Sequence, residues 1–367
     1  MEVITLLQGS EESSLTPFFM VHAISGVALP FLRLDVLGDS DRPVYGITNH
    51  IHCPGNEDVE YPSSLTELAK VYLREIREIQ PQGPYLLGGW SMGGMIAMFM
   101  AQTLISRHEE VLKVIMIDSA NPEAFPSFVS VEQHKAFAKA TYAKISHTLE
   151  AETSVECECI DEPPIDTKRR GSDDSLTVSR QTTWSSVDSG LGSSRASSVF
   201  DFETPETRPG TPMSLVCSSD ETSACCSDDE DMDTTDSFCE YEDDDDECET
   251  EPLQDLFVNI NLHVHQGIGL IAGVSPGDLF QPGTRSDFDV LLVKCRPEPP
   301  NAKHKHYDVE GAEYIAAVMR ESSMAWDASR FRSFESVPFS GDHDGAFEPQ
   351  HVGELSMILR AGLDNVG

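Results

Sequence analysis

The sequence has few basic residues and no long apolar run. It holds 25 lysines and arginines against 63 aspartates and glutamates, which gives a formal net charge of −38 over 367 residues. A surface of this charge repels phosphate backbones, so nucleic acid is not an expected partner. No run approaches the roughly 18 apolar residues that a membrane span needs, and no apolar signal-peptide core follows Met1. Neither membrane insertion nor secretion is therefore predicted.

The cysteines lack the spacing of metal ligands or of a disulfide framework. There are nine, an odd number, and seven of them lie between Cys157 and Cys248. Cys157-x-Cys159 and Cys225-Cys226 are not C-x-x-C pairs, and no nearby histidine completes a set of four ligands. We expect unpaired thiols in a reducing, cytoplasmic compartment, with no metal and no cofactor.

The acidic residues are concentrated in one internal segment. Between Glu150 and Asp255 there are 31 acidic and 6 basic residues, so this segment carries 25 of the 38 net negative charges. Hydrophobic periodicity is lost there, which predicts a disordered acidic insert over residues 150–252. Patterns typical of sheet elements lie on both sides of it. We therefore expect one α/β domain, made of residues 1–149 and 253–367.

Short apolar runs alternate with longer amphipathic segments on both sides of the insert, which is typical of a mostly parallel sheet flanked by helices. The expected strands are 18–21, 44–47, 85–87, 112–117, 289–293 and 334–339. The expected helices are 63–80, with a capping box at Ser64-x-x-Glu67, then 95–104, 131–149, part of 253–272, and 352–363.

The most informative motif is Gly89-Trp90-Ser91-Met92-Gly93, which lies where an apolar run turns directly into a helical one. A turn this tight leaves no room for side chains two positions either side of the serine, so glycine is the tolerated residue there. Ser91 then stands exposed at a helix N-terminus as a candidate nucleophile. The backbone N–H of Met92 faces the place where negative charge develops on an attacked carbonyl. The plainer alternative is a buried serine that closes a tight turn.

A serine nucleophile needs an acid to orient its base. Asp118 follows the strand after the nucleophile helix, and the carboxyl ends of parallel strands meet at one edge of a sheet. We therefore expect Asp118 beside Ser91. The alternative is an aspartate that caps its own loop through Ser119 and Asn121.

Twelve histidines compete for the role of base. His343 lies just after the expected strand 334–339 and just before the last helix, so it also falls at the carboxyl edge. The order Ser91, Asp118, His343 is the order of nucleophile, acid and base in α/β-hydrolases. Asp342 and Asp344 flank the histidine, but adjacent side chains point away from its ring. Several other histidines are expected at the surface, namely His134, His147, His263, His265, His304 and His306.

The second donor of the oxyanion hole is expected in the loop after the first expected strand, within His22-Ala23-Ile24-Ser25-Gly26. The N–H of Ile24 is the first candidate to act with that of Met92, and the N–H of Ala23 is the second. The position of His22 at the strand end indicates a structural hydrogen bond that shapes the loop.

Taken together, these residues resemble the type I thioesterase domains that end non-ribosomal peptide synthetases, polyketide synthases and animal fatty acid synthase, and the free-standing relatives of those domains. The similar stretches are 17–26, 42–47, 80–94, 117–119 and 341–343. The resemblance implies an α/β-hydrolase fold, with Ser91 as nucleophile, Asp118 as orienter and His343 as base. It also implies Ile24 and Met92 as the oxyanion pair. The first expected strand lies near Met1 and no carrier-like domain is present, so the free-standing form is expected.

In that family the serine takes an acyl, polyketide or peptidyl chain from a phosphopantetheine or coenzyme A thioester, and hydrolysis or cyclisation releases it. The implied partners are an acyl carrier protein, a peptidyl carrier domain or acyl-CoA, in secondary metabolite biosynthesis. The family's helical lid corresponds to residues 131–149 and 253–285. The insert departs from the family because it is far longer than such a lid needs.

Other functions stay open at this point. One is a carboxylester hydrolase, and another is a non-catalytic interaction protein whose acidic insert does the binding, although the intact Ser91, Asp118 and His343 argue against the latter. The insert also holds strings that resemble kinase sites, so a kinase acting on it is a further hypothesis, with a plain solvated spacer as the alternative. These strings surround Ser172, Ser197, Ser218 and Ser227.

Overall fold

The computed structural model describes residues 2–37, 41–55, 60–125, 127–156, 251–281, 283–297, 313–364 and 366. The chain divides into two units, Met1–Asp161 with Glu247–Gly367, and Glu162–Asp246, and the second lies wholly outside the described residues. The expected insert therefore falls almost entirely outside the described residues, as do its four kinase-like strings, His304 and His306. Helix α3 continues to Glu156 and helix α4 begins at Glu251, so both helices extend past the expected boundaries of the insert.

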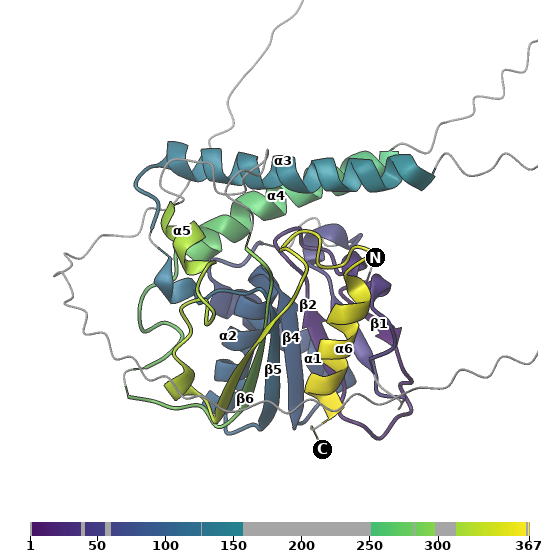
Figure 1. Cartoon of the computed structure of the whole chain (residues 1–367), viewed down its shortest axis with the longest axis vertical. Coiled ribbons are helices and arrows are strands. Elements are labelled where there is room, and N and C mark those ends of the chain that lie inside the picture. Colours follow the sequence, from purple (N-terminus) through teal and green to yellow (C-terminus); the bar gives the residue numbers. More distant parts are fainter. Residues whose placement is uncertain are drawn as a thin grey trace, which may run out of the picture. The chain divides into compact units, whose positions relative to one another are not determined.

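A seven-stranded sheet forms the centre of the first unit, in the order β1-β3-β2-β4-β5-β6-β7. All neighbouring strands are parallel except β1 and β3 (Figure 1). The strands are β1 (Ile4–Gln8), β2 (Phe18–Val21), β3 (Val44–Ile47), β4 (Tyr85–Trp90), β5 (Val111–Ile117), β6 (Asp289–Lys294) and β7 (Ser333–Pro338). The six predicted strands are present. Strand β1 is additional, because an edge strand that is only partly buried has a weak apolar pattern.

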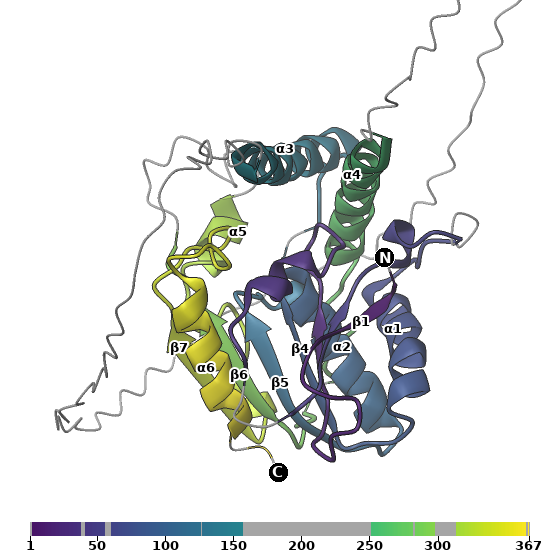
Figure 2. The ribbon, with the colours of Figure 1, turned by 90° about the vertical axis from the view of Figure 1, so that its right-hand side faces the viewer.

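Helices cover both faces of the sheet (Figure 2). Successive side chains of a strand point to opposite faces, so the strands supply an apolar core to each face. On one face, Phe19 and Leu87 pack against α1 (Leu65–Ile79) and α2 (Met92–Ser106). On the other, their neighbours Phe18 and Leu86 pack with residues of α6 (Val352–Asp364) and of the short helix η1 (Leu29–Arg33). The remaining short helices are η2 (His50–His52), η3 (Pro122–Ala124), α5 (Glu313–Val318) and η4 (Ala328–Arg330).

The capping box of α1 is only half formed. The Ser64 hydroxyl accepts a hydrogen bond from the Glu67 N–H at 3.2 Å, as predicted. The Glu67 carboxylate accepts instead from the N–H and hydroxyl of Ser63, one residue earlier than the motif requires. Helix α2 also begins earlier than predicted, at Met92 rather than Met95, because it starts directly from the turn after β4.

Helices α3 (Val131–Glu156) and α4 (Glu251–Ala272) lie together across the end of the sheet at which the parallel strands finish (Figures 1 and 2). They pack on each other through a small apolar cluster of their own that contains Ala138, Ile260, Val264 and Ile268. This α3–α4 pair therefore covers the edge where the candidate site was expected. Among the helices in the described part of the chain, none combines the length and apolarity needed to cross a membrane.

Candidate active site

The turn between β4 and α2 places Ser91 in a strained backbone conformation. Its φ is 56° and its ψ is −121°, and a backbone with positive φ is rare for residues other than glycine. A hydrogen bond of 2.9 Å from the Ser91 N–H to the Ile117 carbonyl holds it there. A Cβ atom at Gly89 would lie 2.4 Å from the carbonyl carbon of Gly93, and one at Gly93 would lie 2.1 Å from the Val21 oxygen. Both glycines are therefore required, as the motif predicted.

Asp118 follows β5 directly and is held by three donors. It is 3% exposed, and its own N–H donates to the Val293 carbonyl at 2.8 Å. Its Oδ1 accepts from the Lys294 ammonium at 2.8 Å and from the Cys295 N–H at 3.1 Å. Its Oδ2 lies 2.8 Å from His343 Nδ1. The carboxylate therefore faces the imidazole and does not cap its own loop.

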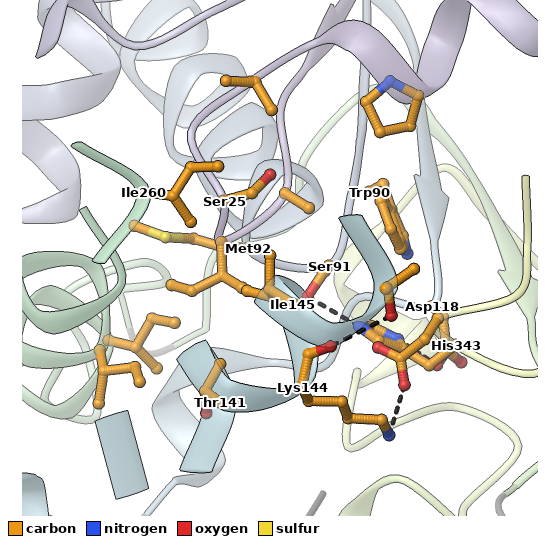
Figure 3. A pocket seen from close by; sticks show the side chains of 18 of the residues that line it. Ser25, Trp90, Ser91, Met92, Asp118, Thr141, Lys144, Ile145, Ile260 and His343 are labelled. Atoms are coloured by element: carbon orange, nitrogen blue, oxygen red, sulfur yellow. Dashed lines mark hydrogen bonds and ion pairs between the residues drawn. The ribbon is translucent and has the colours of Figure 1, made fainter. Parts of the chain in front are cut away.

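His343 lies in the loop between β7 and α6 and bridges the other two residues. Its Nε2 is 3.1 Å from Ser91 Oγ, while its Nδ1 contacts Asp118 (Figure 3). An ionised carboxylate only accepts hydrogen bonds, so Nδ1 carries a proton, and in the neutral imidazole Nε2 presents its lone pair to the serine hydroxyl. Ser91 and Asp118 come from before the acidic insert and His343 from after it, and the structure brings the three together.

The charges at the site favour an ionised acid and a basic imidazole. Burial raises the pKa of Asp118, but the hydrogen bond and charge of His343, followed by those of Lys294, lower it below its usual value. Burial lowers the pKa of His343, but the hydrogen bond and charge of Asp118 outweigh this, so the pKa is raised. The pair is thus suited to take a proton from the serine hydroxyl.

Sequence reasoning missed two lysines at this site. Lys294 is the last residue of β6, and its ammonium pairs with Asp118. Lys144 reaches down from α3, and its ammonium pairs with Asp344 Oδ2 at 2.5 Å (Figure 3). A charged residue at the carboxyl end of an otherwise apolar strand was the available signal for Lys294. No local pattern pointed to Lys144, because its partner lies 200 residues further along the chain.

The expectation that His263 is a surface residue is wrong. It is completely buried, because α4 packs that side of the helix onto the loop after β2, and its Nδ1 lies 2.9 Å from the Ile24 carbonyl oxygen. His134 and His265 are half-buried rather than exposed, since the packing of α3 on α4 brings them together. His147 is exposed, as expected. The structural hydrogen bond predicted for His22 is present, from Nδ1 to the Ala23 carbonyl at 2.6 Å.

A cavity of about 290 Å³ opens beside Ser91, between the α3–α4 pair and the end of the sheet. Ile24, Ala23 and Met92, the candidate oxyanion donors, line the same cavity as Ser91. Charged side chains of Arg33, Lys144, Asp344 and Glu348 contribute to its wall. The rest is mainly apolar, including Met95, Phe125, Phe128, Phe137, Ile145, Leu149, Leu256, Ile260, Ile268 and Ile271. Such a cavity suits an apolar acyl chain.

No cluster of potential metal ligands exists among the described residues. The two cysteines in that part of the chain, Cys53 and Cys295, are buried. The side chains gathered at the site are a hydrogen-bonded serine, histidine and aspartate beside a largely apolar cavity.

Comparison with known proteins gives several matches. A family model described as thioesterase domain matches residues 16–140. Thioesterase pytI of Aspergillus terreus is 32% identical over 380 aligned residues, which cover 100% of both chains. Thioesterase pynI of Aspergillus niger is 27% identical over 376 residues, again covering 100% of both. The non-reducing polyketide synthase PFUR17_0229 of Pseudevernia furfuracea is 37% identical over 126 residues, which are 34% of this chain and 6% of the synthase.

Solved structures also match over nearly the whole chain. The NocB thioesterase domain, in covalent complex with a fluorophosphonate nocardicin G analogue, has a TM-score of 0.50 at 16% identity and covers 98% of this chain and 99% of its own. The four-domain non-ribosomal peptide synthetase holo-AB3403 has a TM-score of 0.51 at 17% identity, covering 98% of this chain and 20% of its own. At these identities the likeness concerns the fold alone. It confirms the predicted α/β-hydrolase architecture.

Proposed function

Because this chain belongs to the thioesterase family, we propose that Ser91 accepts an acyl chain from a thioester and that His343 and Asp118 serve it as base and orienter. The observation that carries this proposal is the continuous hydrogen-bonded chain from Ser91 Oγ through both ring nitrogens of His343 to Asp118 Oδ2. In the neutral form of His343, this arrangement supports transfer of the serine proton to Nε2 while Asp118 holds the ring through Nδ1.

Acylation begins when Ser91 Oγ attacks the carbonyl carbon of the thioester and its proton passes to His343 Nε2. The backbone N–H groups of Met92 and Ile24, with that of Ala23 as second choice to Ile24, donate to the oxyanion of the tetrahedral intermediate. When the intermediate collapses, the carbon–sulfur bond breaks and the leaving thiolate takes the proton from His343. Asp118 stabilises the transient imidazolium and keeps its own charge throughout.

Release of the acyl chain uses the same groups in the reverse order. His343 takes a proton from water, and the resulting oxygen nucleophile attacks the Ser91 ester. Collapse of the second intermediate breaks the bond to Ser91 Oγ, which recovers its proton from the imidazolium. A hydroxyl or amine of the acyl chain itself replaces water when the product is a ring.

The favoured substrate is a polyketide, peptidyl or fatty acyl chain on the phosphopantetheine of an acyl or peptidyl carrier, or on coenzyme A, in secondary metabolite biosynthesis. The full-length similarity to fungal thioesterases and the partial similarity to non-reducing polyketide synthases support this choice. The largely apolar cavity beside Ser91 supports an apolar acyl group. The runner-up is a carboxylester hydrolase, which uses the same residues on an oxygen ester.

For the domain organisation, we propose that residues 1–149 and 253–367 form the thioesterase domain and that the α3–α4 pair is its lid. The position of the pair across the cavity supports this role. A cytoplasmic location and a kinase that acts on the acidic segment remain proposals from the sequence.

The test is labelling with a fluorophosphonate probe, combined with hydrolysis of an acyl-pantetheine thioester and of the matching simple ester. We expect the wild-type chain to be labelled on the Ser91 peptide and to prefer the thioester, and we expect Ser91→Ala to lose both labelling and turnover. Ser106→Ala is the matched control, because Ser106 is exposed at the far end of the same helix. Equal labelling of Ser91→Ala and wild type contradicts the proposal, and a preference for the ester favours the runner-up.

A further inference from the structure

Three histidines from three separate parts of the chain surround the loop after β2. His22 directly follows β2, His52 lies in η2 and His263 lies in α4, a helix of the α3–α4 pair. Their exposures are 0%, 6% and 0%, so all three are inside the molecule. The rings of His22 and His263 are 4.9 Å apart between centroids, and those of His52 and His263 are 6.2 Å apart. They form one buried cluster, which we call the imidazole cluster.

Each ring of the imidazole cluster contacts a different, consecutive carbonyl oxygen of the loop. His22 Nδ1 lies 2.6 Å from the Ala23 oxygen. His263 Nδ1 lies 2.9 Å from the Ile24 oxygen, and His52 Nε2 lies 3.1 Å from the Ser25 oxygen. A carbonyl oxygen only accepts, so each of these ring nitrogens must carry its proton and donate. The loop backbone is thus held by three imidazole donors in a row.

The three rings are neutral near physiological pH, which fixes these donor roles. Burial lowers the pKa of His263 to about 3 and that of His52 to about 4. Burial, and then the neighbouring His263, keep the pKa of His22 well below its usual value. His22 Nε2 accordingly accepts from the Tyr72 hydroxyl at 2.5 Å, and that hydroxyl accepts from Asn49 Nδ2 at 2.8 Å.

The contacts fix both peptide planes that meet at Ile24. A trans peptide is planar, so the N–H of one residue points opposite to the carbonyl of the residue before it. The Ala23 carbonyl is held by His22 and by the Gly26 N–H at 3.0 Å, which sets the direction of the Ile24 N–H. The Ile24 carbonyl is held by His263, which sets the plane on its other side. The N–H that is proposed to meet the oxyanion is thereby oriented from both ends.

We propose that His263 of α4 is a positioning residue for the oxyanion loop, so that the loop reaches its catalytic geometry only when α4 is seated on it. His22 and His52 hold the carbonyls on either side. This inference rests on the proposed function, because it assumes that the loop stabilises a tetrahedral intermediate. The α3–α4 pair then affects the catalytic rate constant in addition to enclosing the substrate.

The test exploits the fact that an asparagine amide nitrogen occupies the place of Nδ1, whereas a glutamine amide nitrogen occupies that of Nε2. For His263, which donates through Nδ1, we expect His263→Leu and His263→Gln to lower kcat for an acyl-pantetheine thioester by about 10- to 100-fold, with KM changed less than about threefold. We expect His263→Asn to retain most of the wild-type kcat. His265→Leu, two residues along the same helix and packed on His134 of α3, is the matched control with unchanged kcat.

His52 donates through Nε2, so the order of its variants must be the opposite. We expect His52→Gln to keep most of the activity and His52→Asn to lose it. A loss of packing or of stability would not reverse the order of the Asn and Gln variants between His263 and His52. Equal losses of kcat for Asn and Gln at both positions therefore overturn the inference. Full kcat in His263→Leu also overturns it. Failure of the proposed function would look different from failure of this inference. In that case the wild-type protein hydrolyses no thioester and the fluorophosphonate does not label Ser91.

Discussion

At the level of single residues, the carboxylate of Asp118 contacts two basic side chains instead of one. His343 contacts its Oδ2 and Lys294 contacts its Oδ1, and Lys294 is 11% exposed. The lysine charge offsets part of the field that Asp118 exerts on the imidazole. We therefore expect Lys294 to limit how far Asp118 raises the pKa of His343.

Replacing Lys294 by methionine tests this. His343 must be neutral to act as a base, so activity rises with pH through its pKa. Without the ammonium group, Asp118 raises that pKa further, and the acid limb of the pH profile of kcat/KM moves to higher pH. The other charged groups near His343, Asp344 and Lys144, are unchanged. Lys294→Arg keeps the charge and is the control, and an unmoved acid limb in Lys294→Met contradicts the assignment.

At the level of elements, the turn from β4 to α2 is built on the close approach of Gly93 to β2. A Cβ atom there would lie 2.1 Å from the Val21 oxygen and 2.3 Å from the His22 oxygen. Both are backbone atoms, so relief requires α2 to move away from the oxyanion loop. The same glycine thus sets the spacing between the nucleophile and the loop.

We expect Gly93→Ala to lower the free energy of unfolding by about 1–3 kcal/mol, as overpacking does, and to lower kcat as well. Gly353→Ala is the matched control in helix α6, because its Cβ would meet only Asp35 Oδ2 at 3.7 Å. There the gain in helix propensity should raise the free energy of unfolding by about 0.5–1 kcal/mol. Urea unfolding measures both changes, and equal effects of the two substitutions contradict the steric argument.

Helices, strands and turns were predictable where neighbouring residues in the sequence determine them. Buried parallel strands such as β5 are continuous apolar runs, and the glycines of the turn at Ser91 mark its geometry. The partners of Lys294 and His263 lie 176 and 239 residues away along the chain. The roles of Lys294 and His263 depend on which side of β6 or α4 faces the site, and no local sequence pattern predicts this.

At the level of the whole molecule, the imidazole cluster links stability to pH. His22, His52 and His263 have lowered pKa values in the folded state, whereas each takes up a proton near pH 6.5 once unfolded. Their contribution to stability is therefore complete above about pH 6.5 and is lost as pH falls towards the folded-state values. The pKa of His343 is raised, so its opposite contribution varies only above about pH 6.5.

We expect the free energy of unfolding to fall between about pH 6 and pH 5 with a slope approaching 4 kcal/mol per pH unit, since each of the three protons contributes about 1.4 kcal/mol per unit. Urea unfolding at several pH values measures the slope. His263→Asn keeps the hydrogen bond but removes one proton, so it should reduce the slope by about a third. A slope that is the same in both proteins contradicts the linkage.

The proposed nucleophile Ser91 and acid Asp118 precede the stretch of chain between α3 and α4, and the proposed base His343 follows it. The part before that stretch supplies β1 to β5, and the part after it supplies β6, β7 and α6. Within the described residues, the contacts between the two parts include the β5–β6 ladder, the α3–α4 contact and the hydrogen bonds of His343. The enzyme is in this sense bipartite. If the polypeptide is cut between α3 and α4, one fragment carries Ser91 and Asp118 and the other carries His343. Thioester hydrolysis by the mixed fragments then measures how well they reassociate.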